Sequence, residues 1–150
     1  MRKLILIVLI LFPACEKSEI TDITSQCEFY GCGYLGKCFG NWHGEIVIRN
    51  QEEFQRVGDS VRIHPVNINC DTAQLPEIDF DHYSLIGKFT IGGGCGCQYF
   101  RRVLEDQQND HVIYEINNRY YGECKVLIID MNWALVPRIP DHYTVKFVLK

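Results

Sequence analysis

The 150-residue sequence lacks the short motifs that mark the common catalytic and nucleotide-binding sites. It contains no G-x-S-x-G, no H-E-x-x-H and no kinase signature, so it offers no nucleophile elbow, zincin site or kinase site. Three glycines stand at 92–94, but no Lys-Ser/Thr pair follows them, which argues against a phosphate-binding P-loop. We therefore assign no catalytic residue.

An excess of basic residues and a long apolar run are also missing. Lys and Arg number 15 against 19 Asp and Glu, and no basic patch is present, so nucleic acid is not an expected partner. The apolar run at 4–12 has nine residues. A membrane-spanning helix needs roughly 20, so this run does not predict one.

The first fifteen residues instead predict a processed leader. Arg2 and Lys3 precede the apolar run, and Pro13, Ala14 and Cys15 close it, in the order of a secretory signal peptide. The ending "LFPAC" resembles the lipobox of bacterial lipoproteins, in which a cysteine after a small residue becomes the lipid-modified first residue. The resemblance implies a signal peptide at 1–14 and lipid attachment at Cys15. The alternative is a cytosolic protein with an apolar start.

Cleavage before Cys15 would leave 136 residues, the length of one domain. It would also remove two basic residues, so that 13 remain against 19 acidic ones. Residues 16–26 are polar and β-branched without an apolar period, and we predict that 15–26 form a lipidated tether. Residues 27–150 are predicted to be a single mainly-β domain, in which 27–44 form a loop rich in Cys and Gly. The lipid membrane would be a partner through acylated Cys15, at the outer membrane of a bacterial cell envelope, facing the periplasm or the surface.

In the first half of this domain, the sequence pattern predicts two strands and a short helix. Alternation places Ile46 and Ile48 on the inner face of a strand at 45–49. A helix follows, with Asn50 as N-cap, Glu53 as its partner and Gly58 as its end. Residues 59–80 are predicted to be a long loop, and 83–91 a strand in which Gly87 marks a bulge or a close backbone approach.

The second half predicts a meander. Strands are expected at 98–105 and at 111–116, with Val112, Tyr114 and Ile116 on one face, and a turn at 117–123. The apolar run at 124–130 predicts a central strand covered on both faces, and 142–150 a half-buried last strand. The fold class is therefore mainly β: a small β-sandwich or partly open barrel with one short helix, stapled by disulfides.

Three stretches carry a family resemblance: "IVIRNQEEF", "LPEIDFDHYSLIGKF" and "VPRIPDHYTVKFVL". They resemble uncharacterised small bacterial lipoproteins, and they are distantly similar to the C-terminal domain of a protease-complex accessory lipoprotein. The resemblance covers roughly residues 46–150. It implies a β-rich extracytoplasmic domain that binds a partner, and it supplies no catalytic residue.

Seven further cysteines are candidates for disulfides, because an oxidising compartment favours their pairing. They are Cys27, Cys32, Cys38, Cys70, Cys95, Cys97 and Cys124. An odd number leaves one thiol over, and the possible connectivities number about 105. Cys95 and Cys97 are each expected to have a distant partner, with Cys124 and Cys70 as the natural choices.

The pair Cys95 and Cys97 also permits a metal or redox role, since soft thiolates select copper(I) or zinc. Structural zinc sites repeat a cysteine pair, whereas this C-x-C is single and no C-x-x-C is present. We therefore assign no metal ligand and no cofactor. A carboxylate and histidine group near His82 would serve a metal or catalytic site, provided that Asp79 and Asp81 share a strand face and His82 meets His142. In the ordinary alternative these residues cap turns.

Four aromatic residues, Trp42, Trp133, Tyr120 and Tyr121, fit either a binding surface or core packing. The sequence as a whole predicts a membrane-anchored extracytoplasmic lipoprotein that acts as a binding or accessory module, with an envelope protein as its partner. The competing hypothesis is a metal-handling or redox protein that uses Cys95 and Cys97 with the nearby His82.

Overall fold

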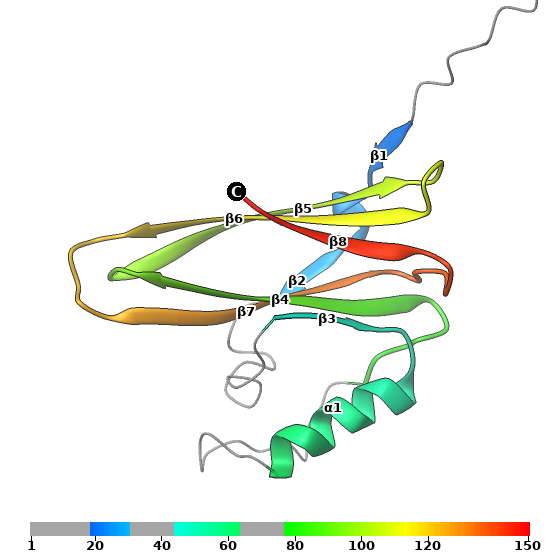
Figure 1. Cartoon of the computed structure of the whole chain (residues 1–150), viewed down its shortest axis with the longest axis horizontal. Coiled ribbons are helices and arrows are strands. Elements are labelled where there is room, and N and C mark those ends of the chain that lie inside the picture. Colours follow the sequence, from blue (N-terminus) through cyan, green and yellow to red (C-terminus); the bar gives the residue numbers. More distant parts are fainter. Residues whose placement is uncertain (1–18, 31–43, 64–76) are drawn as a thin grey trace, which may run out of the picture.

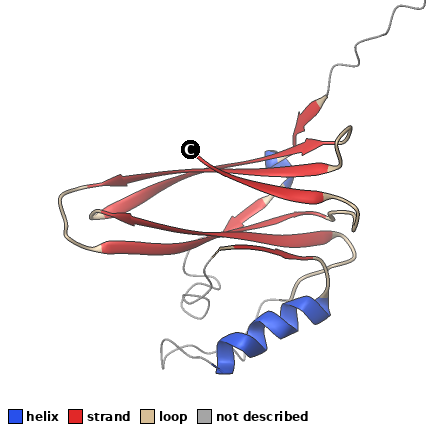
Figure 2. Cartoon of the chain, viewed as in Figure 1, coloured by secondary structure: helices blue, strands red, loops and turns tan. Residues whose placement is uncertain are grey.

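Strands dominate the fold, as Figure 2 shows. The computed structural model describes residues 19–30, 44–63 and 77–150. Two four-stranded sheets stack face to face, and one α-helix lies against the outer face of the second sheet (Figure 1). The predicted mainly-β fold is confirmed, as a sandwich of two separate sheets and not as a closed barrel. No helix in these ranges has the length and apolar character needed to cross a membrane.

The first sheet, sheet A, has the strand order β1-β5-β6-β8. Its strands are β1 (Ile20–Asp22), β5 (Gly96–Asp106), β6 (His111–Tyr121) and β8 (Thr144–Leu149). The second, sheet B, has the order β2-β7-β4-β3, with β2 (Glu28–Tyr30), β7 (Leu127–Pro137), β4 (Tyr83–Gly93) and β3 (Glu45–Ile48). All neighbouring strands are antiparallel except β6 and β8, which are parallel.

Side chains of β4 and β7 alternate between two hydrophobic cores. These strands pair from Tyr83 opposite Pro137 to Gly93 opposite Leu127, and successive side chains of a strand point to opposite faces. One set lies in the sandwich core between the sheets. The buried residues of this core are Ile23, Ile86, Val103, Val112, Tyr114, Ile116, Ala134, Val136 and Ile139. The other set packs against the helix. The buried residues of this second core are Ile46, Ile48, Phe54, Val57, Leu85, Met131 and Trp133. Where these two cores lie, sheet B is therefore covered on both faces.

The helix α1 (Gln51–Ile63) starts as predicted but runs further. Asn50 Oδ1 accepts the Glu53 amide at 2.8 Å, which is an N-cap. The Glu53 carboxylate reaches back to the amide of Arg49 at 2.7 Å, one residue before the expected one. The predicted end at Gly58 is wrong: Gly58 is buried, and it is not among the residues with positive φ, the conformation that ends many helices.

The predicted loop at 59–80 is corrected by the same extension, because residues 59–63 are helical. Residues 64–76, including Cys70 and His64, lie outside the described ranges. The alternating pattern predicted that the Val47 side chain points outward, but it packs against the sandwich core. The strand β3 therefore contributes to both cores.

Two boundaries near the N-terminus also differ from the sequence prediction. Within the predicted tether, residues 20–26 are folded: β1 pairs with β5, and Ile23 is only 7% exposed. Within the predicted loop at 27–44, residues 28–30 form β2, while 31–43, with Cys32, Cys38, Trp42 and His43, lie outside the described ranges.

The predicted turn at 117–123 is largely strand, because β6 continues to Tyr121. The next strand begins at Leu127, three residues later than predicted. It is central in sheet B, but it is covered on both faces only further along, since Leu127 and Ile129 are exposed. Val112, Tyr114 and Ile116 share the buried face of β6, as predicted.

Gly87 shows the close approach that the sequence predicted, without a bulge. The register runs unbroken through Gly87 against both β3 and β7. A Cβ atom added at Gly87 would lie 2.6 Å from Cε3 of Trp133 and 2.7 Å from Cε of Met131. Trp133 is fully buried, so its ring has little freedom to yield.

We expect Gly87→Ala to lower the free energy of unfolding by about 1–3 kcal/mol, because the added methyl group overpacks the core beside Trp133. Urea denaturation measures this change. Gly93→Ala, in the same strand, is the matched control, because no atom lies within 4 Å of its added Cβ. Equal unfolding free energies for the two variants would contradict the packing of Trp133 over Gly87.

Candidate functional site

The stretch "IGGGCGCQYF" carries the chain from sheet B to sheet A. The strand β4 ends at Gly93 and β5 begins at Gly96. The chain returns to sheet B between Tyr121, at the end of β6, and Leu127, at the start of β7. Both connections lie at the same end of the sandwich (Figure 1). We refer to residues 89–93, 96–101, 117–121 and 127–132 as the crossover half of the sandwich.

A disulfide between Cys95 and Cys124 joins the two connections. The Cys95 amide donates to the Tyr121 carbonyl at 2.7 Å, and the Cys124 amide lies 3.2 Å from Cys95 Sγ. Gly122 makes room for this bridge: its φ is +84°, and an added Cβ would lie 2.4 Å from Cys95 Sγ. The expectation that Cys95 has a distant partner is confirmed, with Cys124 in that place.

Cys97 was expected to have a distant partner as well, and this was wrong, because its thiol is free in the structure. Cys27 is free too and lies 3.3 Å from the Ile23 carbonyl oxygen. Burial raises the pKa of the Cys97 thiol, and burial raises the pKa of Cys27 to about 12. A reactive cysteine needs a lowered pKa, so neither thiol is set up as a nucleophile. Cys15, Cys32, Cys38 and Cys70 lie outside the described residues.

The proposed grouping of Cys95, Cys97 and His82 is not present. His82 precedes β4 and Cys95 follows it, so a strand of eleven residues separates them, a length of about 36 Å at ~3.3 Å per residue. Among residues 19–30, 44–63 and 77–150, no three His, Cys, Asp or Glu side chains are placed to hold a metal ion.

The histidines near strand starts pair separately with carboxylates. His82 Nδ1 lies 2.7 Å from Asp79 Oδ2, and His142 Nε2 lies 3.7 Å from Asp110 Oδ1. Asp79 and Asp81 precede β4 and do not share a strand face; Asp79 Oδ1 instead accepts the Asp81 amide at 3.0 Å. The hydrogen bond between their side chains raises the pKa of His82 and lowers the pKa of Asp79. Both side chains are largely exposed, which fits the turn-cap interpretation.

Polar side chains fill the interior of the crossover half. The Thr90 hydroxyl accepts hydrogen bonds from Nδ2 of Asn118 at 2.9 Å and Nδ2 of Asn132 at 2.8 Å. Arg101 Nε donates to Asn132 Oδ1 at 3.2 Å, and Arg101 Nη1 donates to the Tyr30 carbonyl at 3.1 Å. Thr90 is 7% exposed and Asn132 fully buried. The network therefore links the two sheets where the apolar core has ended.

A second polar group lies beside this network. Asp130 is 2% exposed, and the Arg101 guanidinium stacks 4.8 Å above the centre of the Tyr99 ring. Burial, followed by the hydrogen bond to the Asp130 carboxylate, raises the pKa of Tyr99. The phenol therefore stays protonated at neutral pH and serves as a donor.

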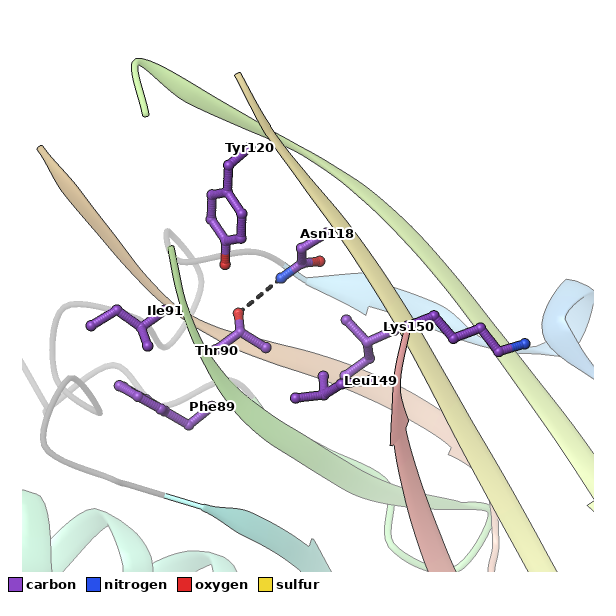
Figure 3. A pocket seen from close by; sticks show the side chains of 8 residues that line it. Phe89, Thr90, Ile91, Asn118, Tyr120, Leu149 and Lys150 are labelled. Carbon is purple, nitrogen blue, oxygen red and sulfur yellow. Dashed lines mark hydrogen bonds between the residues drawn. The ribbon is translucent and has the colours of Figure 1, made fainter. Parts of the chain in front are cut away.

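A pocket of about 250 Å³ opens at the side of the crossover half, where the two sheets face each other (Figure 3). We call it the seam pocket. Its apolar wall comes from Phe89, Ile91, Ile116 and Leu149. Thr90, Asn118 and Tyr120 contribute polar groups, and the Asn118 and Tyr120 side chains extend from β6 toward β4 (Figure 3).

The seam pocket exists because two edge strands stop short. The strand β3 pairs with residues 85–88 of β4, and β8 pairs with residues 111–116 of β6. Beyond these positions, no described strand pairs with β4 or β6 on this side. Side chains of both strands therefore form an open seam instead of a covered core.

Two buried polar atoms at the pocket have no hydrogen-bond partner among the described residues. They are Asn118 Oδ1 and the Tyr120 hydroxyl oxygen. A buried polar group without a partner costs about 1–3 kcal/mol. Both atoms are covered by protein, so an occupant gains this free energy only if the Asn118 or Tyr120 side chain turns toward it. Lys150 lines the pocket too, but its ammonium points away and lies 2.8 Å from Glu115 Oε1 (Figure 3). The pocket therefore favours an uncharged occupant.

A wider hollow of about 410 Å³ includes Asp22, Arg102, Glu115 and Lys150 in its lining. These four side chains already form two ion pairs, Arg102 with Asp22 and Lys150 with Glu115, each at 2.8 Å. The hollow therefore presents satisfied charges, whereas the seam pocket presents unsatisfied groups. We take the seam pocket as the candidate site.

Of the three described aromatic residues considered from the sequence, only Tyr120 lines the seam pocket. Trp133 is core, Tyr121 is 61% exposed, and Trp42 lies outside the described residues. The sequence analysis did not identify Asn118, Thr90 or Leu149 as site residues. The period-two alternation of 112, 114 and 116 continues to Asn118 and Tyr120, and this was the available signal. Comparison with protein-family models, with curated proteins and with solved structures finds no match to the chain.

Replacing both Cys95 and Cys124 with serine should lower the free energy of unfolding by about 3–4 kcal/mol, as the chain-entropy model gives for a loop of this length. The two cysteines are 29 residues apart. Urea denaturation measures the change, and Cys97→Ser is the control, since its thiol is free. A loss of the same size in Cys97→Ser alone would contradict the assigned pairing.

Proposed function

We propose that the chain is a lipid-anchored, extracytoplasmic binding module that uses the seam pocket to engage a partner in the cell envelope. The observation that carries the binding role is the seam pocket itself, which combines an apolar wall with two unpartnered polar atoms. No described cluster of titratable groups forms part of it, and Lys150 is already paired.

Two features support the location. The ending "LFPAC" resembles a lipobox, with Cys15 as the lipidated residue. The disulfide between Cys95 and Cys124 supports an oxidising compartment, because such bonds are rare in the cytosol. An outer-membrane anchor in a bacterial envelope, facing the periplasm or the surface, is consistent with both features.

The accessory role has separate support from the sequence. The stretches at 46–54, 75–89 and 136–149 resemble small bacterial lipoproteins and, distantly, the C-terminal domain of a protease-complex accessory lipoprotein. A module of this kind acts by contact with another protein. We therefore propose an envelope protein as the partner.

Cys15→Ser should release the protein from membranes, because it removes the thiol that would carry lipid. Cells are grown with a clickable fatty acid, and label and membrane association are then measured after an alkaline wash. The unaltered chain and Cys97→Ser should carry the label and stay in the membrane fraction. Retention of Cys15→Ser in the washed membranes would contradict the anchor.

A photo-crosslinking amino acid in place of Leu149 should give a discrete adduct with an envelope protein in living cells. Leu149 lines the seam pocket and is 54% exposed, so it tolerates replacement. The same amino acid in place of Leu127, 66% exposed and outside the pocket, is the control. Adducts of equal yield from both positions, or none from position 149, would contradict a partner at the seam.

A further inference from the structure

Beyond the end of β8, no described strand pairs with β6 on the side next to the seam pocket. The Lys150 amide donates to the Ile116 carbonyl at 2.9 Å, so the backbone groups of Ile116 face β8. Backbone direction alternates along a strand, so those of Asn118 and Tyr120 face the same side. The Cys95 amide donates to Tyr121 at 2.7 Å, which places Tyr121 on the opposite side, toward β5.

The seam pocket lies where the next inward side chain of a longer β8 would stand. Leu149 is opposite Ile116 in the parallel pair. Inward side chains recur every second residue, so the following inward position would be opposite Asn118. The pocket is lined by Leu149 and Ile116 on one side of that position and by Asn118 and Tyr120 on the other. Among the described residues, no strand continues β8 there.

The size of the pocket selects its occupant. Sites for drug-sized ligands measure roughly 300–1,000 Å³, and the seam pocket measures about 250 Å³. This volume suits a single large side chain better than a cofactor. The apolar wall, together with the pairing of Lys150 and Glu115, favours an uncharged side chain.

The described part of this edge lacks one common protection against an added strand, an inward-pointing charge. Natural edges are often guarded by inward-pointing charges, but the inward residues of this stretch, Asn118 and Tyr120, are uncharged. The nearest positive charge on β6, Arg119, lies on the outer face, with its guanidinium 5.1 Å above the Phe100 ring. Open backbone groups beside a side-chain pocket are the features that bind peptides by strand addition.

We propose that this edge of β6 and the seam pocket bind an extended segment of a partner polypeptide. The segment adds to sheet A as a strand in line with β8, and one large uncharged side chain enters the pocket. This inference rests on the proposed binding role and specifies its partner as an extended polypeptide.

The test uses the full-length purified chain and a phage-displayed library of linear 12-residue peptides. Selection should enrich peptides with a large apolar residue between polar ones, and the best peptide is then synthesised. Replacing Leu149 by glutamate should weaken its binding by about tenfold or more, because a charge would enter the pocket rim. Leu127→Glu is the matched control and should leave the affinity within about twofold. No enrichment, or equal effects of the two variants, overturns the proposal.

Methylation of single backbone amides of the peptide separates strand addition from other binding modes. Every second amide should be essential, with losses of about tenfold or more, because alternate amides pair with the β6 edge. Losses without this period of two overturn the proposal. A stable homodimer that excludes the peptide overturns it as well, since a second copy would then occupy the edge.

Failure here is distinguishable from failure of the proposed function. If position 149 gives adducts but the amide-methylation losses show no period of two, strand addition is refuted and the partner site at the seam pocket is not. If the chain made in cells carries no fatty acid but still binds the peptide, the anchor is refuted and strand addition is not.

Discussion

The antiparallel pairing of β4 with β7 is the constraint on which the rest of the structure depends. Each strand supplies alternate side chains to the sandwich core and to the core under α1, so a shift of one residue would exchange the two sets. Trp133 lies over Gly87, where no other residue leaves room for its ring. This contact marks the register at the centre of the pair, and β3, α1 and β2 assemble around it.

The two halves of the sandwich are stabilised differently. One half has an apolar interior with Val112, Tyr114 and Ile116. In the crossover half, the interior consists of hydrogen-bonded polar groups around Thr90 and Asn132, and the Cys95–Cys124 disulfide closes the end. The hydrogen bond from Asn118 to Thr90 ties the two sheets together in this half, while the disulfide restricts the unfolded chain. The seam can therefore stay open without loss of the fold.

Sequence patterns predicted the parts that depend on local periodicity. Ile46 and Ile48 followed a period of two into a core, and Asn50 capped the helix. Prediction failed where tertiary packing overrides local preference. Asn117 and Asn118 favour a turn, yet they continue β6, because the Asn118 side chain bonds to Thr90 across the sandwich. Gly58 did not end the helix, and residues 20–22, which show no apolar period, pair with β5.

The candidate site was beyond reach of the sequence for a different reason. The seam pocket exists because β3 and β8, which lie in different sheets, both stop short of the crossover half. No local pattern encodes that coincidence, although the alternation that ends in Asn118 and Tyr120 marks one wall. Cys95 and Cys124 were found by their chemistry, whereas the free thiol of Cys97 follows only from the structure.

The most direct test of an open edge is residue-resolved amide hydrogen exchange of the free chain by NMR. We predict that the amides of Asn118 and Tyr120 exchange at least about tenfold faster than those of Asn117 and Arg119, which face β5. Equal protection of all four amides would contradict the account, because the edge would then be covered.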